Sequence, residues 1–270
     1  MMRLRKWQSE CIHQALHHYQ STPHFLCQAT PAAGKTAMAT ELAVRLHEQG
    51  LVDFILCFSP SILVSQGFKN SFSKRLKRRF DGKVGSLGGA YTYQGMVHLG
   101  KAFWEVLEHH RVFVIFDEIH HCSGVTERDA NSWGEEILTH IKGRATYTLA
   151  LSGTPWRSDC SPIVLSSYTG VGRQINCDYR YSLSDAVKDK VCRSPKIVLT
   201  DNERLRVSIG QEETKEFTSI KDLLGESGIS YQSIILDYNA IKHNLVLGCR
   251  KLSQIRQHNP SAGGLVVASS

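Results

Sequence analysis

The stretch Ala29-Thr30-Pro31-Ala32-Ala33-Gly34-Lys35-Thr36 decides how this chain folds. It follows the apolar run Phe25-Leu26-Cys27 and precedes a segment with helical spacing of apolar residues. A strand, a glycine-containing turn and a helix in this order are typical of a phosphate-binding loop, in which backbone N–H groups and the positive end of the helix surround phosphate oxygens. The alternative is an ordinary strand–turn–helix connection, because Ala29 stands where the usual pattern has its first glycine.

In a loop of this kind, the lysine reaches the outer phosphates of a nucleoside triphosphate and the following hydroxyl binds Mg²⁺. We therefore expect Lys35 to contact phosphate and Thr36 to hold the metal. The predicted nucleotide contacts of the loop are Thr30, Pro31, Ala32, Ala33, Gly34, Lys35 and Thr36.

A second segment, Val112-Phe113-Val114-Ile115-Phe116, supports this interpretation. Five successive branched or aromatic residues predict a strand that is buried on both faces. The strand ends in Asp117 and Glu118, and open α/β sheets bind their ligands at the carboxyl ends of their strands. We expect Asp117 to hold Mg²⁺ through water and Glu118 to orient and deprotonate an attacking water. The alternative for a single carboxylate is a polar strand end that faces solvent. This alternative does not account for a phosphate-loop pattern and a carboxylate pair in this order, each after an apolar run.

With Asp117-Glu118-Ile119-His120, the chain resembles the first motor domain of a superfamily 2 helicase or translocase, in the branch that includes restriction-enzyme motor subunits. The resemblance covers about residues 1–200. It implies catalysis by Lys35, Asp117 and Glu118, with ATP and Mg²⁺ as cofactors and His120 at the nucleotide. Arg5-Lys6-Trp7-Gln8 resembles the element whose glutamine contacts adenine, so Gln8 is the implied base contact. An exposed residue on a first helix is the alternative for Gln8.

The resemblance extends to segments that contact nucleic acid or couple it to the nucleotide site. Phe58-Ser59-Pro60-Ser61, Leu63-Val64-Ser65-Gln66 and Tyr91-Thr92-Tyr93-Gln94 match the contacting segments, and Leu151-Ser152-Gly153-Thr154-Pro155-Trp156-Arg157 matches the coupling motif. The residues implied are Ser59, Pro60, Gln66, Thr92, Tyr93, Ser152 and Thr154. Helix capping is an equal alternative for Ser61 and a lesser one for Thr92. Trp156 beside Arg157 favours a packed aromatic ring next to a solvated charge.

Composition agrees with a partner that carries phosphates, because the formal net charge is +7. The densest positive run, Lys74-Arg75-Leu76-Lys77-Arg78-Arg79, favours a solvated helix face. Because it follows the segment at Ser59–Gln66, we also expect some of it to follow a nucleic-acid strand. The implied partner is DNA, duplex or single-stranded, with RNA as the alternative, together with a nuclease or restriction partner.

Eight cysteines occur without a C-x-x-C pair, which argues against a zinc ribbon and a disulfide framework. Cys27 and Cys57 lie in apolar runs and are predicted to be buried. His120-His121-Cys122 argues against a metal site, because three consecutive residues rarely converge on one ion. The apolar runs are strand-sized and the N-terminus lacks the apolar core of a secretory signal, so we expect a cytoplasmic location and no membrane partner.

Alternation of helical and strand patterns predicts an α/β fold, a parallel sheet covered by helices on both faces, and the resemblance makes it RecA-like. The expected helices are Trp7–Tyr19, Thr36–Glu48, Leu63–Phe72, Gly100–His109 and Ser132–Ile141. The expected strands are Phe25–Gln28, Phe54–Phe58, one near Lys83–Leu87, Val112–Phe116 and Thr146–Leu151.

Three regions are predicted: a RecA-like ATP-binding domain over 1–200, a mainly helical linker or insertion over 201–260, and the first strand of a truncated second RecA-like domain over 261–270. Weak helix is expected at Gln211–Leu224 and a long amphipathic helix at Tyr231–Gln257. The family's second domain supplies arginines for hydrolysis, so the resemblance implies a fragment that hydrolyses ATP slowly. The alternatives are a nucleotide-switched binding module without turnover and an RNA-remodelling ATPase.

Overall fold

Six parallel strands form one sheet in the order β3-β2-β4-β5-β1-β8. This computed structural model describes residues 3–170, 174–194, 205–207, 215–225, 230 and 236–267. The chain divides into two units, 1–194 and 195–270, and the sheet belongs to the first. Its strands are β1 (His24–Ala29), β2 (Phe54–Ser59), β3 (Gly88–Thr92), β4 (Val112–Asp117), β5 (Tyr147–Ser152) and β8 (Tyr179–Tyr181).

The register brings the carboxyl ends of the central strands to the same edge of the sheet. Gln28 of β1 lies opposite Ser152 of β5, and Asp117 of β4 lies opposite Leu151. We call this side the carboxyl edge and the opposite side, where the strands begin, the amino edge. All six residues of β4 are buried, as a central strand covered on both faces requires.

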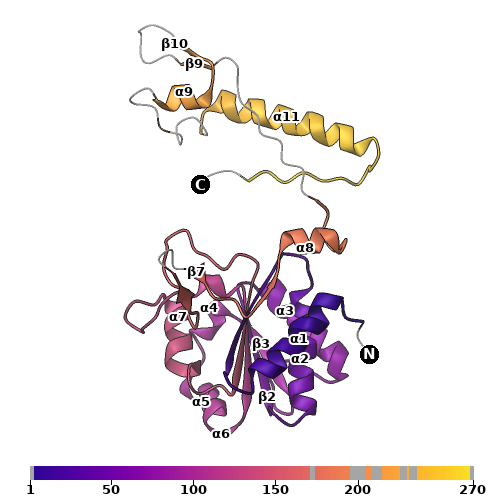
Figure 1. The fold of residues 1–270 in the computed structure, drawn as a ribbon, viewed down its shortest axis with the longest axis vertical. Helices are drawn as coiled ribbons and strands as arrows, with labels where there is room; N and C mark the ends of the chain where they lie inside the picture. The colour runs from indigo at the N-terminus through magenta and orange to yellow at the C-terminus, as the bar shows by residue number, and fades with distance from the viewer. Residues whose placement is uncertain are drawn as a thin grey trace. The chain divides into compact units, whose positions relative to one another are not determined.

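Helices cover both faces of the sheet (Figure 1). One face carries α1 (Lys6–His18), α2 (Lys35–Glu48) and α3 (Ile62–Leu76). The other carries α4 (Tyr93–Met96), α5 (Lys101–Trp104), α6 (Val106–His109) and α7 (Ser132–Glu136). Each face has its own apolar core; the first includes Ile12, Leu42 and Phe68, and the second includes Phe116, Trp104 and Ile137. The predicted RecA-like α/β arrangement is thus confirmed.

Three predicted elements differ from those observed. The strand near Lys83–Leu87 is wrong, because β3 begins at Gly88. A Cβ at Gly88 would lie 1.8 Å from the Ile55 carbonyl oxygen, so glycine permits the close pairing with β2. The single helix Gly100–His109 is instead two short helices that meet at Glu105. After α7 the chain continues as a π-helical turn, η2 (Ile137–Ile141), in which the Lys142 N–H donates to the Ile137 carbonyl.

The first unit also contains smaller elements around the sheet. A 3₁₀ turn, η1 (Ile119–His121), follows β4, and a two-stranded antiparallel sheet joins β6 (Tyr168–Thr169) to β7 (Gln174–Ile175). After β8, the helix α8 (Leu183–Lys188) begins with a capping box between Ser182 and Asp185.

Among its described residues, the second unit contains helices, as predicted, and a pair of strands. Strand β9 (Leu205–Val207) pairs antiparallel with β10 (Lys215–Phe217), and α9 (Ile220–Gly225) follows. The described part of the expected helix Gln211–Leu224 is therefore a strand followed by a helix. Helix α11 (Tyr238–Arg256) begins where the Asp237 carboxylate accepts two backbone N–H groups, and residues 231–235 of the expected helix lie outside the described residues.

The apolar stretch near the end of the chain does not form the expected strand. Residues 262–267 have no regular structure, and Leu265 and Val267 are 89% and 85% exposed. No strand among the described residues of this unit pairs with them, and an apolar segment becomes a strand only when a neighbour accepts its hydrogen bonds. Across the described ranges, every helix is too short or too polar to cross a membrane.

Candidate functional site

The phosphate loop lies at the carboxyl edge, between β1 and α2, as the sequence predicts. Its backbone is left-handed at Ala32 (φ 62°) and at Gly34 (φ 97°). The left-handed φ at Gly34 favours glycine, and a Cβ there would lie 2.8 Å from Gln8 Nε2 and displace that amide. The start of the loop is held by β8, because the Thr30 N–H donates to the Tyr181 carbonyl at 3.1 Å.

Lys35 connects the loop to the acidic end of β4. Its side chain is 9% exposed, and Nζ lies 3.2 Å from the Ala29 carbonyl oxygen and 3.2 Å from Glu118 Oε1. A buried ammonium requires a partner of opposite charge, and Glu118 supplies one. The two predicted catalytic groups are therefore in direct contact.

Asp117 is buried, and its Oδ1 has no hydrogen-bond partner in the structure. Burial raises the pKa of this carboxyl to about 6; the charge of Glu118 also raises it, and Lys35 opposes the shift. A buried unpaired carboxylate oxygen is an arrangement that a cation stabilises. With the hydroxyl of Thr36 in the first turn of α2, the donor set consists of the hard oxygen ligands that Mg²⁺ prefers.

Glu118 adopts a left-handed backbone conformation (φ 51°), which is unfavourable for a residue with a side chain. Its Oε2 accepts a long hydrogen bond of 3.4 Å from the Gly153 N–H and lies 3.4 Å from His120 Nδ1. Strain of this kind is commonly retained where a side chain must point in one direction. Here it directs the carboxylate toward Lys35.

His120 links the acidic turn to the predicted coupling motif. Its Nδ1 lies 2.9 Å from Ser152 Oγ, which in turn accepts the Thr154 N–H at 3.1 Å. Burial is the main cause that lowers the pKa of His120, which favours the neutral ring. The structure therefore brings His120 and Ser152 together, while Thr154 is exposed to solvent beside them.

Gln8 is buried, and its side-chain amide donates one hydrogen bond and accepts another. Nε2 donates to the Gly34 carbonyl at 2.9 Å, and Oε1 accepts the Arg5 N–H at 2.8 Å. Arg5 was not singled out from the sequence, yet its guanidinium donates to the Ala33 carbonyl at 2.5 Å. Its place three residues before Gln8, at the N-cap of the same helix, could have indicated this role. Adenine recognition by Gln8 stays a prediction.

Two of the residues expected to contact nucleic acid are not available for it. Ser59 is 1% exposed and its Oγ lies 2.7 Å from Ser65 Oγ; Tyr93 is fully buried and its hydroxyl donates to the Asp117 carbonyl at 2.8 Å. Both side chains are occupied inside the protein, so a nucleic-acid contact at these positions would have to use the backbone, and it stays a prediction. Pro60 is half-buried and Gln66 is exposed, so both remain accessible.

Ser61 and Thr92 both cap helices. Ser61 Oγ accepts the Val64 N–H at 3.3 Å at the start of α3, and Thr92 Oγ1 accepts the Gly95 N–H at 3.0 Å at the start of α4. Capping satisfies a backbone donor that would otherwise be unpaired. A phosphate contact by Thr92 stays a prediction, and it would have to coexist with this bond.

The basic run does not lie beside the nucleic-acid segment. Helix α3 starts near Ser61 at the carboxyl edge and ends at Leu76, so Lys77, Arg78 and Arg79 lie at the amino edge, shortly before β3 begins. All three are exposed. The length of the helix therefore separates the run from Ser59–Gln66, and contact of part of the run with a nucleic-acid strand stays a prediction.

The cysteines and histidines form no metal centre in the described part of the chain: no group of three His, Cys, Asp or Glu residues is close enough to hold an ion. All eight cysteines are free. Cys27 and Cys57 are fully buried, as predicted.

Comparison with known proteins identifies relatives of this chain. Residues 1–157 match the protein family described as type III restriction enzyme, res subunit. An uncharacterised protein of Mycobacterium tuberculosis is 31% identical over 283 residues, which covers 98% of this chain and 45% of that protein. An uncharacterised protein of Mycobacterium leprae is 29% identical over 282 residues, with the same shares. The chain thus spans about half the length of the curated relatives it matches.

Solved structures with a similar arrangement include a nuclease-deletion mutant of the Type ISP restriction-modification enzyme LlaGI in complex with a DNA substrate mimic. It has a TM-score of 0.46 and 15% identity, covering 70% of this chain and 21% of that chain. The UvsW helicase from bacteriophage T4 has a TM-score of 0.45 and 14% identity, covering 59% and 55%.

Proposed function

The chain belongs to the family described as type III restriction enzyme, res subunit, and from this premise we propose that it is the ATP-binding motor domain of a DNA helicase or translocase. In this proposal, the carboxyl edge binds Mg²⁺ and ATP, and hydrolysis drives movement on nucleic acid. DNA is the partner, with a nuclease or restriction subunit acting beside it in the cytoplasm.

The observation that carries this proposal is a buried carboxylate oxygen without a partner, Asp117 Oδ1, next to the ion pair of Lys35 and Glu118. Keeping such an oxygen unpaired is unfavourable for the ligand-free protein. Mg²⁺ with a triphosphate would supply the cation that Asp117 lacks and the phosphates for the Lys35 ammonium. The left-handed Gly34 supports the same assignment, because it is the N-cap of α2, and backbone N–H groups at a helix N-terminus bind phosphate.

Each side chain then has one role. Lys35 binds the outer phosphates, and Thr36 and Asp117 hold Mg²⁺. Glu118 accepts the proton of the attacking water. Bound Mg²⁺ and ATP supply the phosphoanhydride whose cleavage releases the free energy. Gln8 contacts the adenine with a side-chain amide that donates a hydrogen bond to the Gly34 carbonyl and accepts one from the Arg5 N–H when no nucleotide is bound.

The nucleic-acid side of the proposal uses the accessible residues of the same edge, Pro60, Gln66, Thr92 and Thr154. Of these, Thr154 is connected to Glu118: its N–H donates to Ser152 Oγ, which lies 2.9 Å from His120 Nδ1, and that nitrogen lies 3.4 Å from Glu118 Oε2. A second RecA-like domain would supply the arginines that stabilise the transition state, and these are typically worth on the order of 10³–10⁵ in rate. We therefore expect this chain alone to bind ATP well and to hydrolyse it slowly.

Titration with a fluorescent ATP analogue and Mg²⁺, with and without duplex DNA, tests the proposal. We expect binding by the wild-type chain, a shift in affinity with DNA, and loss of binding in Lys35→Ala. Lys142→Ala removes an exposed lysine instead and should bind as the wild type does.

Binding that ignores DNA would favour the nucleotide-switched module, and a shift with RNA alone would favour an RNA-remodelling ATPase. A folded wild-type chain that binds no nucleotide would refute the proposal.

A further inference from the structure

A cavity of about 400 Å³ lies beside the starts of β1 and β5, away from the phosphate loop. Ligand cavities in proteins range from about 300 to 1,000 Å³, so this one is large enough for a small molecule. Its lining includes His24, the first residue of β1, and Thr148 of β5. Both share a sheet face with Leu26 and Ala150 of the second apolar core, because alternate residues of a strand point the same way. The length of β1 separates the cavity from the nucleotide site.

Most of the remaining lining is apolar. Leu138 and Ile141 come from η2, and Ile163 and Leu165 come from the loop after β5. Of the described residues that line the cavity, only Lys142 carries a formal charge, and it is exposed. An ion inside such a cavity would lack a buried charge to pair with. The lining therefore favours a neutral and mainly apolar guest.

Two polar atoms of the lining residues are buried without a hydrogen-bond partner among the described residues, His24 Nε2 and Ser166 Oγ. The other ring nitrogen of His24 is occupied, because Nδ1 lies 2.7 Å from Thr148 Oγ1. An unpaired buried polar atom is unfavourable, and the large majority of such atoms in proteins have a partner. A guest with a polar group would provide one.

The chemistry of His24 and Ser166 selects a hydroxyl as that group. Burial is the main cause that lowers the pKa of His24 to about 4, and the charge of His18 adds to the shift, so the ring is neutral at pH 7. The free nitrogen of a neutral imidazole is a donor in one tautomer and an acceptor in the other, and a serine hydroxyl is both. A hydroxyl on the guest matches either tautomer, whereas a carboxylate only accepts and an ammonium only donates.

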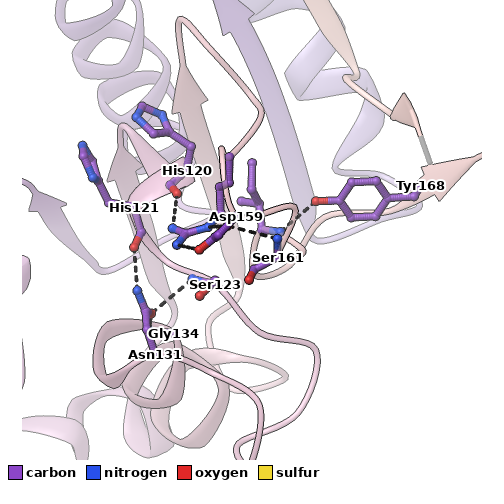
Figure 2. Close-up of polar contacts among 10 residues, drawn as sticks. His120, His121, Ser123, Asn131, Gly134, Asp159, Ser161 and Tyr168 are labelled. Atoms are coloured by element: carbon purple, nitrogen blue, oxygen red, sulfur yellow. Dashed lines mark hydrogen bonds and ion pairs between the residues drawn. The ribbon is translucent and has the colours of Figure 1, made fainter. Parts of the chain in front are cut away.

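The walls of the cavity are held by polar contacts within the protein (Figure 2). The Asn131 side chain accepts the Ser123 N–H at 3.1 Å and so fixes the start of the turn whose residues 124–125 line the cavity. On the other side, the Tyr168 hydroxyl accepts the Ile163 N–H at 2.7 Å. A guest would therefore enter a preformed cavity, where binding orders little of the protein.

The segment that leads from β5 to the cavity is also fixed, by Arg157. The sequence predicts a solvated charge beside a packed ring here, but the Arg157 side chain is 20% exposed and Trp156 is 62% exposed. The guanidinium donates to the His120 carbonyl at 2.7 Å and pairs with Asp159, which also accepts the Ser161 N–H at 3.0 Å (Figure 2). Forked pairing of this kind fixes orientation as well as distance.

From these observations we propose that the cavity binds a neutral, mainly apolar small molecule through a hydroxyl group that bonds to His24 and Ser166. The inference does not rest on the proposed function, because the cavity and the nucleotide site share no described residue. Water is the alternative occupant: it also donates and accepts, but it gains nothing from the apolar walls.

Phenol is the probe, because it joins an apolar ring to one hydroxyl, and toluene is its control, because a methyl group replaces that hydroxyl. Titrations of the isotope-labelled whole chain without nucleotide follow the imidazole nitrogens by NMR. His24→Gln identifies the His24 signals by their absence, and Thr148→Val identifies them independently by shifting Nδ1. We expect phenol to shift the Nε2 signal saturably and to bind at least about tenfold more tightly than toluene.

Ser166→Ala tests the second contact. The substitution should weaken phenol binding by about three- to tenfold and leave toluene binding unchanged. Ser132→Ala alters an exposed serine of α7 and should leave both affinities unchanged.

Equal affinities for phenol and toluene would overturn the inference, because the cavity would then hold apolar molecules without using its polar atoms. Phenol that does not bind saturably, or that leaves the Nε2 signal unmoved, overturns it as well, the former with water as the occupant. Unchanged phenol affinity in Ser166→Ala, or an equal loss in Ser132→Ala, has the same consequence. None of these results concerns nucleotide binding, so the proposed function is tested separately.

Discussion

The two edges of the sheet treat an aspartate in opposite ways. At the amino edge, the Arg111 guanidinium pairs with Asp53 and lowers the pKa of that carboxyl to about 2. At the carboxyl edge, burial raises the pKa of Asp117 to about 6, and one of its oxygens has no partner. Both carboxylate oxygens of Asp53 are bonded to Arg111, whereas Asp117 keeps an oxygen that a bound cation would pair. Pairs of matched variants can test this difference.

The largest effect is expected at Glu118. Glu118→Gln removes the proposed base, and turnover should fall by about 10²–10⁴ while nucleotide affinity is kept. Single-turnover hydrolysis measures the rate, and the fluorescent analogue measures the affinity. Glu108→Gln, which breaks the exposed pair with Arg144, is the control and should leave both unchanged. Equal turnover in the two variants would assign the base to another residue.

The second prediction is a change in the free energy of unfolding that has opposite signs for an aspartate-to-asparagine substitution at the two edges. Asp117→Asn removes a buried charge and should raise the free energy of unfolding by up to about 3 kcal/mol at pH 7.5, in EDTA, since one pKa unit corresponds to about 1.4 kcal/mol. Asp53→Asn breaks the ion pair with Arg111 and should lower the free energy of unfolding. Urea unfolding of both variants measures these changes. Destabilisation by Asp117→Asn would mean that its carboxylate is satisfied in solution.

The pH dependence of the free energy of unfolding follows from the directions of the pKa shifts of Asp117 and Asp53. The folded protein binds the Asp117 proton more tightly than the unfolded chain, so this carboxyl favours folding at low pH and ceases to do so as pH rises from about 4 to 6. The gain from Asp117→Asn should therefore vanish below about pH 4. For Asp53 the pKa is lowered, so its contribution is present above about pH 4 and is lost as pH falls toward 2.

A third comparison uses two left-handed glycines. Gly34→Ala places a Cβ 2.8 Å from Gln8 Nε2 and should lower nucleotide affinity about tenfold or more, with a loss of about 1–3 kcal/mol in stability. Gly50 (φ 66°), at the amino edge, has open space around its Cβ position. Gly50→Ala should therefore lose about 1–2 kcal/mol of stability and no affinity. Equal affinities would show that the loop adjusts to the added carbon.

The smallest effect separates capping from nucleic-acid contact at Ser61. Ser61→Ala removes the cap of α3 and should lower stability by about 1 kcal/mol, whereas Ser61→Asp keeps the cap. The added charge of aspartate would repel phosphate. Weaker DNA binding by Ser61→Asp at unchanged stability would therefore indicate a phosphate contact, and unchanged binding would leave capping as its function.

Sequence patterns predicted most of the sheet and the central groups of the site. Buried parallel strands are continuous apolar runs, and for that reason the sequence predicted β4 and the two carboxylates, Asp117 and Glu118, at its end. The strand near Lys83–Leu87 was placed too early, because Gly88 has no side chain to mark the start of β3, and the Ile55 carbonyl leaves no room for one. Tyr93 and Arg157 were misplaced because burial of a single polar residue depends on contacts distant in sequence.

The bond between Thr30 and Tyr181 affects how the domain is made. The first amide of the phosphate loop is held by the last strand of the sheet, which the ribosome releases long after the loop itself. A nascent chain can assemble β1, β2, β4 and β5 first, but its loop gains this support only when β8 emerges and joins the edge of the sheet. Competence to bind nucleotide would therefore be acquired late in synthesis, when the rest of the sheet is already in place.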